Sequence, residues 1–397
     1  MRIKTTLLSC LISLAAISSV HAVDFEFTYL DDSAGTLAAA GWMDEQSLFQ
    51  RNLRAAGKLW GARIASNETI RVLVTTDASR PVAGGTFSNG RRISKAGATV
   101  DVYEPGALSR INTGTNPGFA SSGFDVKLLF NPTGTQYWMD PSPETRLSEK
   151  PANTGDYIWV MQHEIGHGLG MAGARERQAG HANYGLPSTY MSAFDSLTMF
   201  LGNGLARSSN GTLNSMVFTG PVSAAVYGKQ VDVPSVEPSE SISSQNFYHL
   251  GSCASDLILR RTLMNGCSTP SGPRNFLTDI DLAVFKDMGY PIVRQDAHFE
   301  DTVGVLRAPF VNVPGLGVFD VDLTLTNDVT MEFTLTKAND IPMGVSNPGL
   351  FDTGTNLLVI PAVEVTLGGT IAMYRIELKL VDGSNPMRFA LVNAVVL

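Results

Sequence analysis

Apolar residues recur every three or four positions in three segments of the first three quarters of the chain. This spacing predicts helices at 43–64, 157–169 and 279–288. The first would be amphipathic, and the second is apolar over most of its length. Asp156 stands where the second helix would begin and is a residue type that caps helix N-termini. Gly289 stands where the third helix would end. The sequence therefore predicts several helices within one folded region.

Apolar and polar residues alternate in shorter stretches between these helices. The alternation at 70–74 and at 126–130 predicts two strands. Glycine is frequent at 84–97 and 114–123, and we expect loops there, because neither stretch has the strand and helix context of a phosphate-binding loop. The long segment 173–247 is rich in Gly, Ser, Pro and Asn, and such weakly periodic segments inside a domain are often functional.

The pattern changes to a period of two over about the last hundred residues. Alternating runs occur at 321–325, 329–335, 363–367 and 374–380. Turn residues separate these runs, and no helical spacing interrupts them, which predicts an all-β sandwich. We therefore expect two domains, an α+β domain at 23–293 and a β-sandwich at 297–397.

The composition is that of a folded protein with an acidic surface. Of 397 residues, 44% are apolar and 17% are charged, which is enough to bury a core and excludes general disorder. The formal net charge of -8 argues against a nucleic-acid partner, because such a surface repels phosphates. The Gly and Pro content (38 and 20 residues) indicates many turns.

Residues 1–22 have the features of a secretory signal peptide. Arg2 and Lys4 are basic, Leu7 to Val20 is a short apolar run, and Ala22 ends a suitable cleavage site. The run has about 14 residues, whereas a membrane-spanning helix needs about 20. We expect the chain to be secreted, into the periplasm or the medium, and to have no transmembrane segment.

His163-Glu164-Ile165-Gly166-His167 is an HExxH motif inside the second predicted helix. Residues four apart share one face of a helix, so His163 and His167 could both bind one Zn²⁺. Glu164 could then act as the general base on a water that the metal activates. The helical flanks are the context that this chemistry requires.

A catalytic zinc site needs a third protein ligand, and the residues leave its identity open. The compact metzincin motif HExxHxxGxxH is broken, because Gly170 matches its glycine but Gly173 replaces its last histidine. The third ligand must therefore come from further along the chain. We consider His249, His181 and Asp195, with His298 and Glu176 as weaker alternatives.

At this point the chain resembles the leishmanolysin-type metzincins and related secreted bacterial metalloproteases. The resemblance lies in HEIGHGLG, Phe194-Asp195, Tyr248-His249-Leu250, Leu263-Met264 and the run from Asp281 to Tyr290, and it covers roughly 155–292. In that family an insertion separates the helix from the third histidine, and a turn containing a methionine lies under the metal. The resemblance thus implies that His249 is the third ligand and Met264 the methionine of the Met-turn. Asn265-Gly266 in this turn departs from the family pattern. The resemblance further implies that an edge strand near 126–130 pairs with an extended substrate.

The cysteines predict one disulfide. Signal cleavage would remove Cys10 and leave Cys253 and Cys267, an even count in an oxidising compartment. A bond between them would close a loop of about 15 residues, contribute about 3 kcal/mol and stiffen the segment that follows His249.

These features together predict a secreted zinc metalloendopeptidase that acts on protein or peptide substrates. We expect the β-sandwich to be an accessory domain, with a surface or a polymer as a conceivable ligand. No motif supports a Ca²⁺ site. Two alternatives remain, a secreted adhesion or carbohydrate-binding protein with a structural or degenerate zinc site, and a zinc hydrolase that does not cleave peptides.

Overall fold

The chain forms two compact units in the computed structural model. One unit contains residues 23–141 and 150–292, and the other contains residues 293–397. The structure describes residues 23–396 except 33, 62, 81, 96, 135–136, 144–149, 152, 176–185, 187–188, 202–214, 235–246, 252–254, 256–258, 267–276, 293–296, 301–303, 314–316, 342–348 and 368–369. The predicted signal peptide and both cysteines of the predicted disulfide lie outside the described residues. No helix in the described part of the chain is long and apolar enough to cross a membrane.

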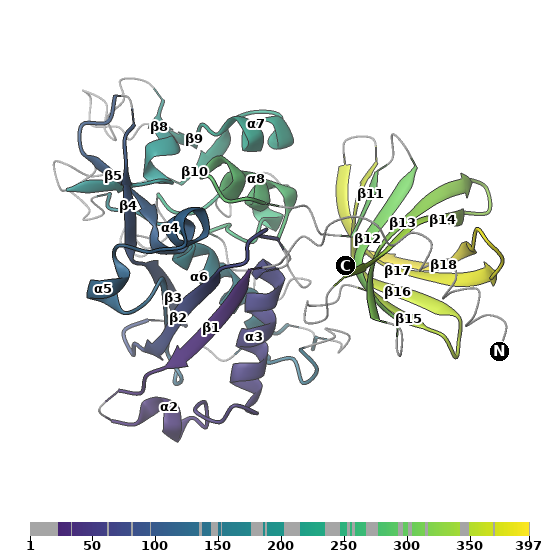
Figure 1. Cartoon of the computed structure of the whole chain (residues 1–397), viewed down its shortest axis with the longest axis horizontal. Coiled ribbons are helices and arrows are strands. Elements are labelled where there is room, and N and C mark those ends of the chain that lie inside the picture. The colour runs from purple at the N-terminus through teal and green to yellow at the C-terminus, as the bar shows by residue number, and fades with distance from the viewer. Residues whose placement is uncertain are drawn as a thin grey trace. The chain divides into compact units, whose positions relative to one another are not determined.

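A four-stranded mixed sheet organises the first unit (Figure 1). Its strands are, in spatial order, β1 (Asp24–Tyr29), β2 (Thr69–Thr76), β6 (Val126–Phe130) and β3 (Ala83–Phe87). The first three run parallel, and β3 is antiparallel to β6. In β2, Ile70, Val72 and Val74 are buried, as their alternation predicts.

Two helices pack against each other and against this sheet. They are α3 (Leu48–Gly61) and α6 (Tyr157–Gly168). The Trp60 indole donates a hydrogen bond to the Gln162 carbonyl (2.8 Å) and so joins the two helices. Asp156 caps α6, because its carboxylate accepts the Ile158 amide, as the sequence predicts. The helix α3 is shorter than the predicted range of 43–64.

Smaller elements complete the first unit. They comprise α2 (Thr36–Ala39), α4 (Gly106–Thr113), α5 (Phe119–Ser122), α7 (Pro221–Tyr227), α8 (Asp279–Asp287), η1 (Asp195–Leu197), η2 (Leu259–Arg261), a sheet of β4 (Asn89–Ile93), β5 (Asp101–Pro105) and β7 (Tyr190–Ser192), and a sheet of β8 (Thr198–Phe200), β9 (Met216–Phe218) and β10 (Val231–Val233). Their apolar side chains join the core of the main sheet, for example Phe194, Phe218 and Phe285. The described part of the segment 173–247 thus contains short strands, the α-helix α7 and the 3-10 helix η1.

The expectation of a loop at 84–97 is wrong, because β3 and β4 lie there. Gly85 explains the glycine in β3: a Cβ atom at this position would lie 1.9 Å from the Glu164 carbonyl oxygen of α6. Only a residue without a side chain lets this strand approach the helix so closely. In the strand order β3 stands at the edge of the sheet and β6 lies between β2 and β3, so the expected edge position of 126–130 is corrected.

The two neighbouring glycines of β3 make a matched pair for testing this contact. We expect Gly85→Ala to lower the free energy of unfolding by about 1–3 kcal/mol. The atoms that the new methyl group would meet are the carbonyl O and C of Glu164 and Cβ of His167, which cannot move aside as the end of a flexible side chain can. A Cβ atom at Gly84 would meet only the flexible Arg80 side chain, at 3.1 Å. Gly84→Ala should therefore stay within about 0.5 kcal/mol of the parent. Urea unfolding of the three proteins measures the difference, and equal losses would contradict the close approach.

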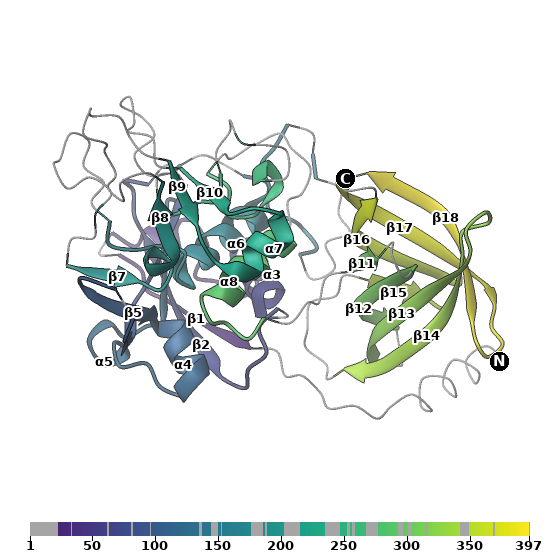
Figure 2. The same cartoon turned by 90° about the horizontal axis from the view of Figure 1, so that it is seen from above.

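The second unit is all β (Figure 2). Its strands are β11 (His298–Glu300), β12 (Val305–Val313), β13 (Gly317–Asn327), β14 (Glu332–Ile341), β15 (Gly349–Asp352), β16 (Leu357–Leu367), β17 (Thr370–Asp382) and β18 (Arg388–Val396). They form a single eight-stranded sheet that closes on itself, because β11 pairs with both β12 and β16, and β15 with both β12 and β16. This differs from the two separate sheets of the predicted sandwich. The core inside contains Leu323, Ile360 and Leu378.

Candidate metal centre

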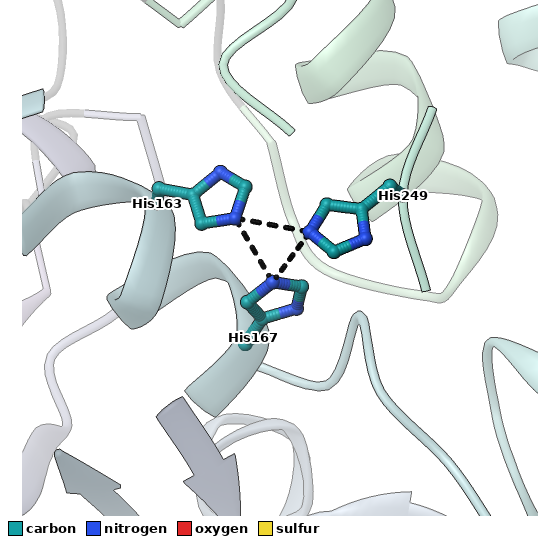
Figure 3. Close-up of side chains that lie close together, drawn as sticks. All are labelled: His163, His167 and His249. Carbon is teal, nitrogen blue, oxygen red and sulfur yellow. Dashed lines mark hydrogen bonds between the residues drawn. The ribbon is translucent and has the colours of Figure 1, made fainter. Parts of the chain in front are cut away.

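Three histidines from two distant segments converge in the first unit (Figure 3). The Nε2 atoms of His163 and His167 are 3.0 Å apart, and each lies 3.2 Å from Nε2 of His249. Among the described residues, these three form the only group of three or more potential metal ligands this close together. The sequence places His163 and His167 on one helix face, and the structure brings His249 to the same point.

Hydrogen bonds to backbone carbonyls orient two of the rings. Nδ1 of His163 lies 2.7 Å from the Leu263 carbonyl oxygen, and Nδ1 of His167 lies 2.7 Å from the Met171 carbonyl oxygen. A carbonyl only accepts, so each Nδ1 carries the proton and each Nε2 presents a lone pair. Burial also lowers the pKa of His163 to about 4, which keeps this ring neutral.

These lone pairs point toward one another, an arrangement that repels in the absence of a cation. Tetrahedral Zn²⁺ with bonds of about 2.0–2.1 Å separates its ligand nitrogens by about 3.3 Å, close to the spacing of the three Nε2 atoms. All three histidines are buried, and each keeps 7–9% of its surface exposed. The donor set and its geometry therefore fit a zinc ion with one open position.

Glu164 follows His163 on α6, and the edge strand holds its carboxylate. Its carboxylate accepts a hydrogen bond from the backbone amide of Gly85 in β3. Burial raises the pKa of Glu164 to about 7, whereas the charge of Arg80 and the Gly85 hydrogen bond oppose this rise. A carboxyl group with a pKa near neutrality can both take up and release a proton at physiological pH.

His249 is positioned by backbone hydrogen bonds of its own segment. The Leu250 amide donates to the Met264 carbonyl (2.8 Å), and the Gly251 amide donates to the Asp232 carbonyl (2.8 Å). The side-chain amide of Asn265 donates to the carbonyls of Leu250 and Leu259 (2.8 and 2.9 Å). Asn265, which departs from the family pattern, is therefore buried and fixed in this turn.

Met264, which the resemblance implies is the methionine of a Met-turn, packs against α6. It is fully buried, and a Cβ atom added at Gly166 would lie 2.4 Å from its sulfur. Gly166 stands between the two helical histidines, so the thioether packs against the α6 backbone directly under them. A polarizable, unbranched side chain suits such an irregular space.

Asp281 of α8 supports this turn, a role that its place in the sequence pattern does not reveal. Its carboxylate accepts the amides of Leu263 (2.8 Å) and Met264 (3.0 Å), and also caps α8 through Thr278. The Leu263 carbonyl in turn accepts from His163. Asp281 thus orients the His163 ring through one peptide unit, although burial raises its own pKa to about 6.

We expect Asp281→Asn to weaken zinc binding by about ten- to a hundredfold, because an amide cannot replace the carboxylate as an acceptor for all of these donors. Competition with a chromogenic chelator measures the affinity. Asp287→Asn is the matched control: Asp287 lies on the same helix but caps α7 by accepting the amides of Val222 and Ser223. Similar zinc affinities in both variants would argue against the link through Leu263.

The alternative ligands are placed elsewhere or lie outside the described residues. Asp195 is fully buried, accepts the amides of Ala174 and Ser192, and forms an ion pair with Arg175 (3.2 Å). His298 belongs to β11 of the second unit. His181 and Glu176 lie outside the described residues.

Two glycines after α6 show why the compact metzincin motif is not used here. Gly170 has a φ of 116° and turns the chain immediately after the helix, as a glycine at this motif position allows. At Gly173, where that motif has its last histidine, a Cβ atom would lie 1.9 Å from the Asp195 carboxylate. A histidine would therefore not fit at residue 173, which agrees with a more distant third ligand.

No protein-family model matches this chain, and neither do the curated proteins or the solved structures with which it was compared.

Proposed function

We propose that this chain is an exported zinc metalloendopeptidase of the leishmanolysin-like type. The observation that carries the proposal is the convergence of three Nε2 atoms, two of them on the helix that also carries Glu164. A purely structural zinc site has four protein ligands and no need of an adjacent carboxylate. Three ligands and a carboxylate of raised pKa on the same helix instead suit hydrolysis.

In this proposal His163, His167 and His249 hold the zinc ion. When bound, the ion supplies Lewis-acid polarisation of the scissile carbonyl and acidifies the attacking water. Glu164 takes the proton from that water and passes it to the leaving amine. The Gly85 amide holds the Glu164 carboxylate in place before the reaction. The carbonyls of Leu263 and Met171 keep two of the rings in the tautomer that binds metal.

The edge strand β3 is the proposed place for the substrate backbone. It stands at the end of the sheet order, so its outer edge has no neighbouring strand among the described residues of this sheet. An extended peptide can add to such an edge through main-chain hydrogen bonds, which bind many sequences. The chain would thus position a peptide bond over Glu164. The closed β sheet of the second unit is the proposed accessory part, and its ligand would be a surface or a polymer.

The proposal is tested on the full secreted chain by zinc content and by cleavage of casein or gelatin. We expect about one zinc per chain and proteolysis that a strong chelator abolishes and added zinc restores. Zinc without cleavage of protein, but with hydrolysis of a non-peptide substrate, would favour the other hydrolase class. Zinc with no hydrolysis would favour a binding protein. Absence of zinc would overturn the metal site itself.

A further inference from the structure

Arg80 places a positive charge on the edge strand next to the proposed site. Its guanidinium lies against Gly84 of β3: a Cβ atom at Gly84 would lie 3.1 Å from Cζ and 3.2 Å from Nε and Nη1 of Arg80. The guanidinium therefore occupies the space that a side chain at residue 84 would fill.

The loop that carries Arg80 is fixed to the sheet. The Arg80 amide donates to the Asp77 carbonyl (3.2 Å), and the Arg80 carbonyl accepts from the Asn131 side chain (2.7 Å). The Nε atom is 3.1 Å from the Asp77 carboxylate. Among the described residues Asp77 is the only partner of the guanidinium, and it contacts Nε and neither Nη group. The side chain is 45% exposed and can meet a ligand from solution.

The strand geometry decides which substrate residue would meet Arg80. The Gly85 amide points away from β6, toward Glu164. In an antiparallel pair the hydrogen-bonding direction alternates, so Gly84 turns its amide and carbonyl toward β6. Successive side chains of a strand lie on opposite faces, and the Gly85 position faces α6, so the Gly84 position and Arg80 lie on the other face.

A substrate strand added to the outer edge of β3 would have one residue opposite Gly84. Its side chain would lie on the face of Arg80, since directly opposite residues share a face with Cβ atoms about 4.5–5.5 Å apart. Because Gly85 contacts Glu164, this residue would lie within about two positions of the scissile bond.

We propose that Arg80 is a specificity-determining residue that binds a substrate Asp or Glu carboxylate opposite Gly84. The inference rests on the proposed peptidase function. A guanidinium that keeps one donor on Asp77 and offers its Nη groups to a second carboxylate is suited to this role, because arginine binds planar carboxylates through paired donors.

The experiment uses the zinc-loaded full chain and a cleaved peptide found in a protein digest. In that peptide each of the three positions on either side of the scissile bond is replaced in turn by Glu and by Gln. We expect one position at which kcat/KM for Glu exceeds that for Gln by about three- to fivefold, as for a half-exposed ion pair. This ratio should decrease as salt is raised.

Variants of Arg80 then test whether this residue causes the preference for Glu over Gln. We expect Arg80→Gln to bring the ratio to about one and Arg80→Lys to leave an intermediate value. Arg92→Gln is the matched control, because Arg92 is an exposed arginine of β4 in an ion pair with Asp101, and it should keep the parental ratio.

The outcomes separate this inference from the peptidase proposal. Cleavage with no preference for Glu at any position, or a preference that survives in Arg80→Gln, would overturn the role of Arg80 and leave the peptidase intact. If the zinc-loaded parent cleaves no peptide and no protein, both fall.

Discussion

Replacing Glu164 with glutamine is expected to abolish peptide hydrolysis while leaving zinc bound. General acid–base catalysis by a positioned side chain contributes about 10²–10⁴-fold, so the loss of kcat should reach at least this range. The three ring nitrogens of the centre belong to other residues, so the zinc content should not change. Glutamine has nearly the same shape and can still accept the Gly85 amide, which limits disturbance of the fold.

The matched control for this substitution is Glu104→Gln. Glu104 is also buried, but its carboxylate pairs with Arg91 (2.8 Å) on β4, outside the metal centre. Its variant should keep zinc and at least most of the activity. A Glu164→Gln protein that still cleaves casein at a comparable rate would contradict the assignment of the base. Loss of zinc from this variant would show that the carboxylate takes part in metal binding.

The helix that carries the site is the element that the sequence predicts best. An apolar run and a capping Asp156 agree, and α6 follows them closely. The strand β3 escapes the same reasoning, because Ala83-Gly84-Gly85 has almost no strand propensity. Gly85 is explained by the helix that approaches it, which is a tertiary contact that no local pattern contains.

The partners of the metal-binding helix are harder to derive for the same reason. His249 follows His167 by 82 residues, and only the resemblance to a family distinguishes it from the other candidates. The role of Asp281 depends on two backbone amides of a distant turn. In the second unit the strands follow from alternation, but the closure of the sheet depends on β11 and β15, which have only 3 and 4 residues. Such short strands give little periodic signal.

Replacing His249 with alanine is expected to remove both zinc and activity. The free energy of zinc binding at a structural site is roughly 10–16 kcal/mol. Divided among four ligands, it gives about 3 kcal/mol for each histidine, which corresponds to about a hundredfold in zinc affinity. Zinc should raise the melting temperature of the parent, since it binds the folded form, and this increase should disappear in His249→Ala. Zinc content, calorimetry with and without zinc, and casein cleavage measure the three effects.

A control histidine distinguishes loss of a ligand from loss of a buried ring. His298 is similarly buried but belongs to the second unit, so His298→Ala should keep zinc, its stabilising effect and proteolysis. If His249→Ala retains zinc and activity, the third ligand lies elsewhere, and His181→Ala becomes the next variant to examine. Asp195→Asn is then informative as well, although its buried pairing with Arg175 predicts a loss of stability and not of zinc. If only His249→Ala loses zinc, His249 is the third ligand. The turn that contains Met264 and Asn265 then supports the metal site, because both residues form hydrogen bonds with Leu250, the neighbour of His249.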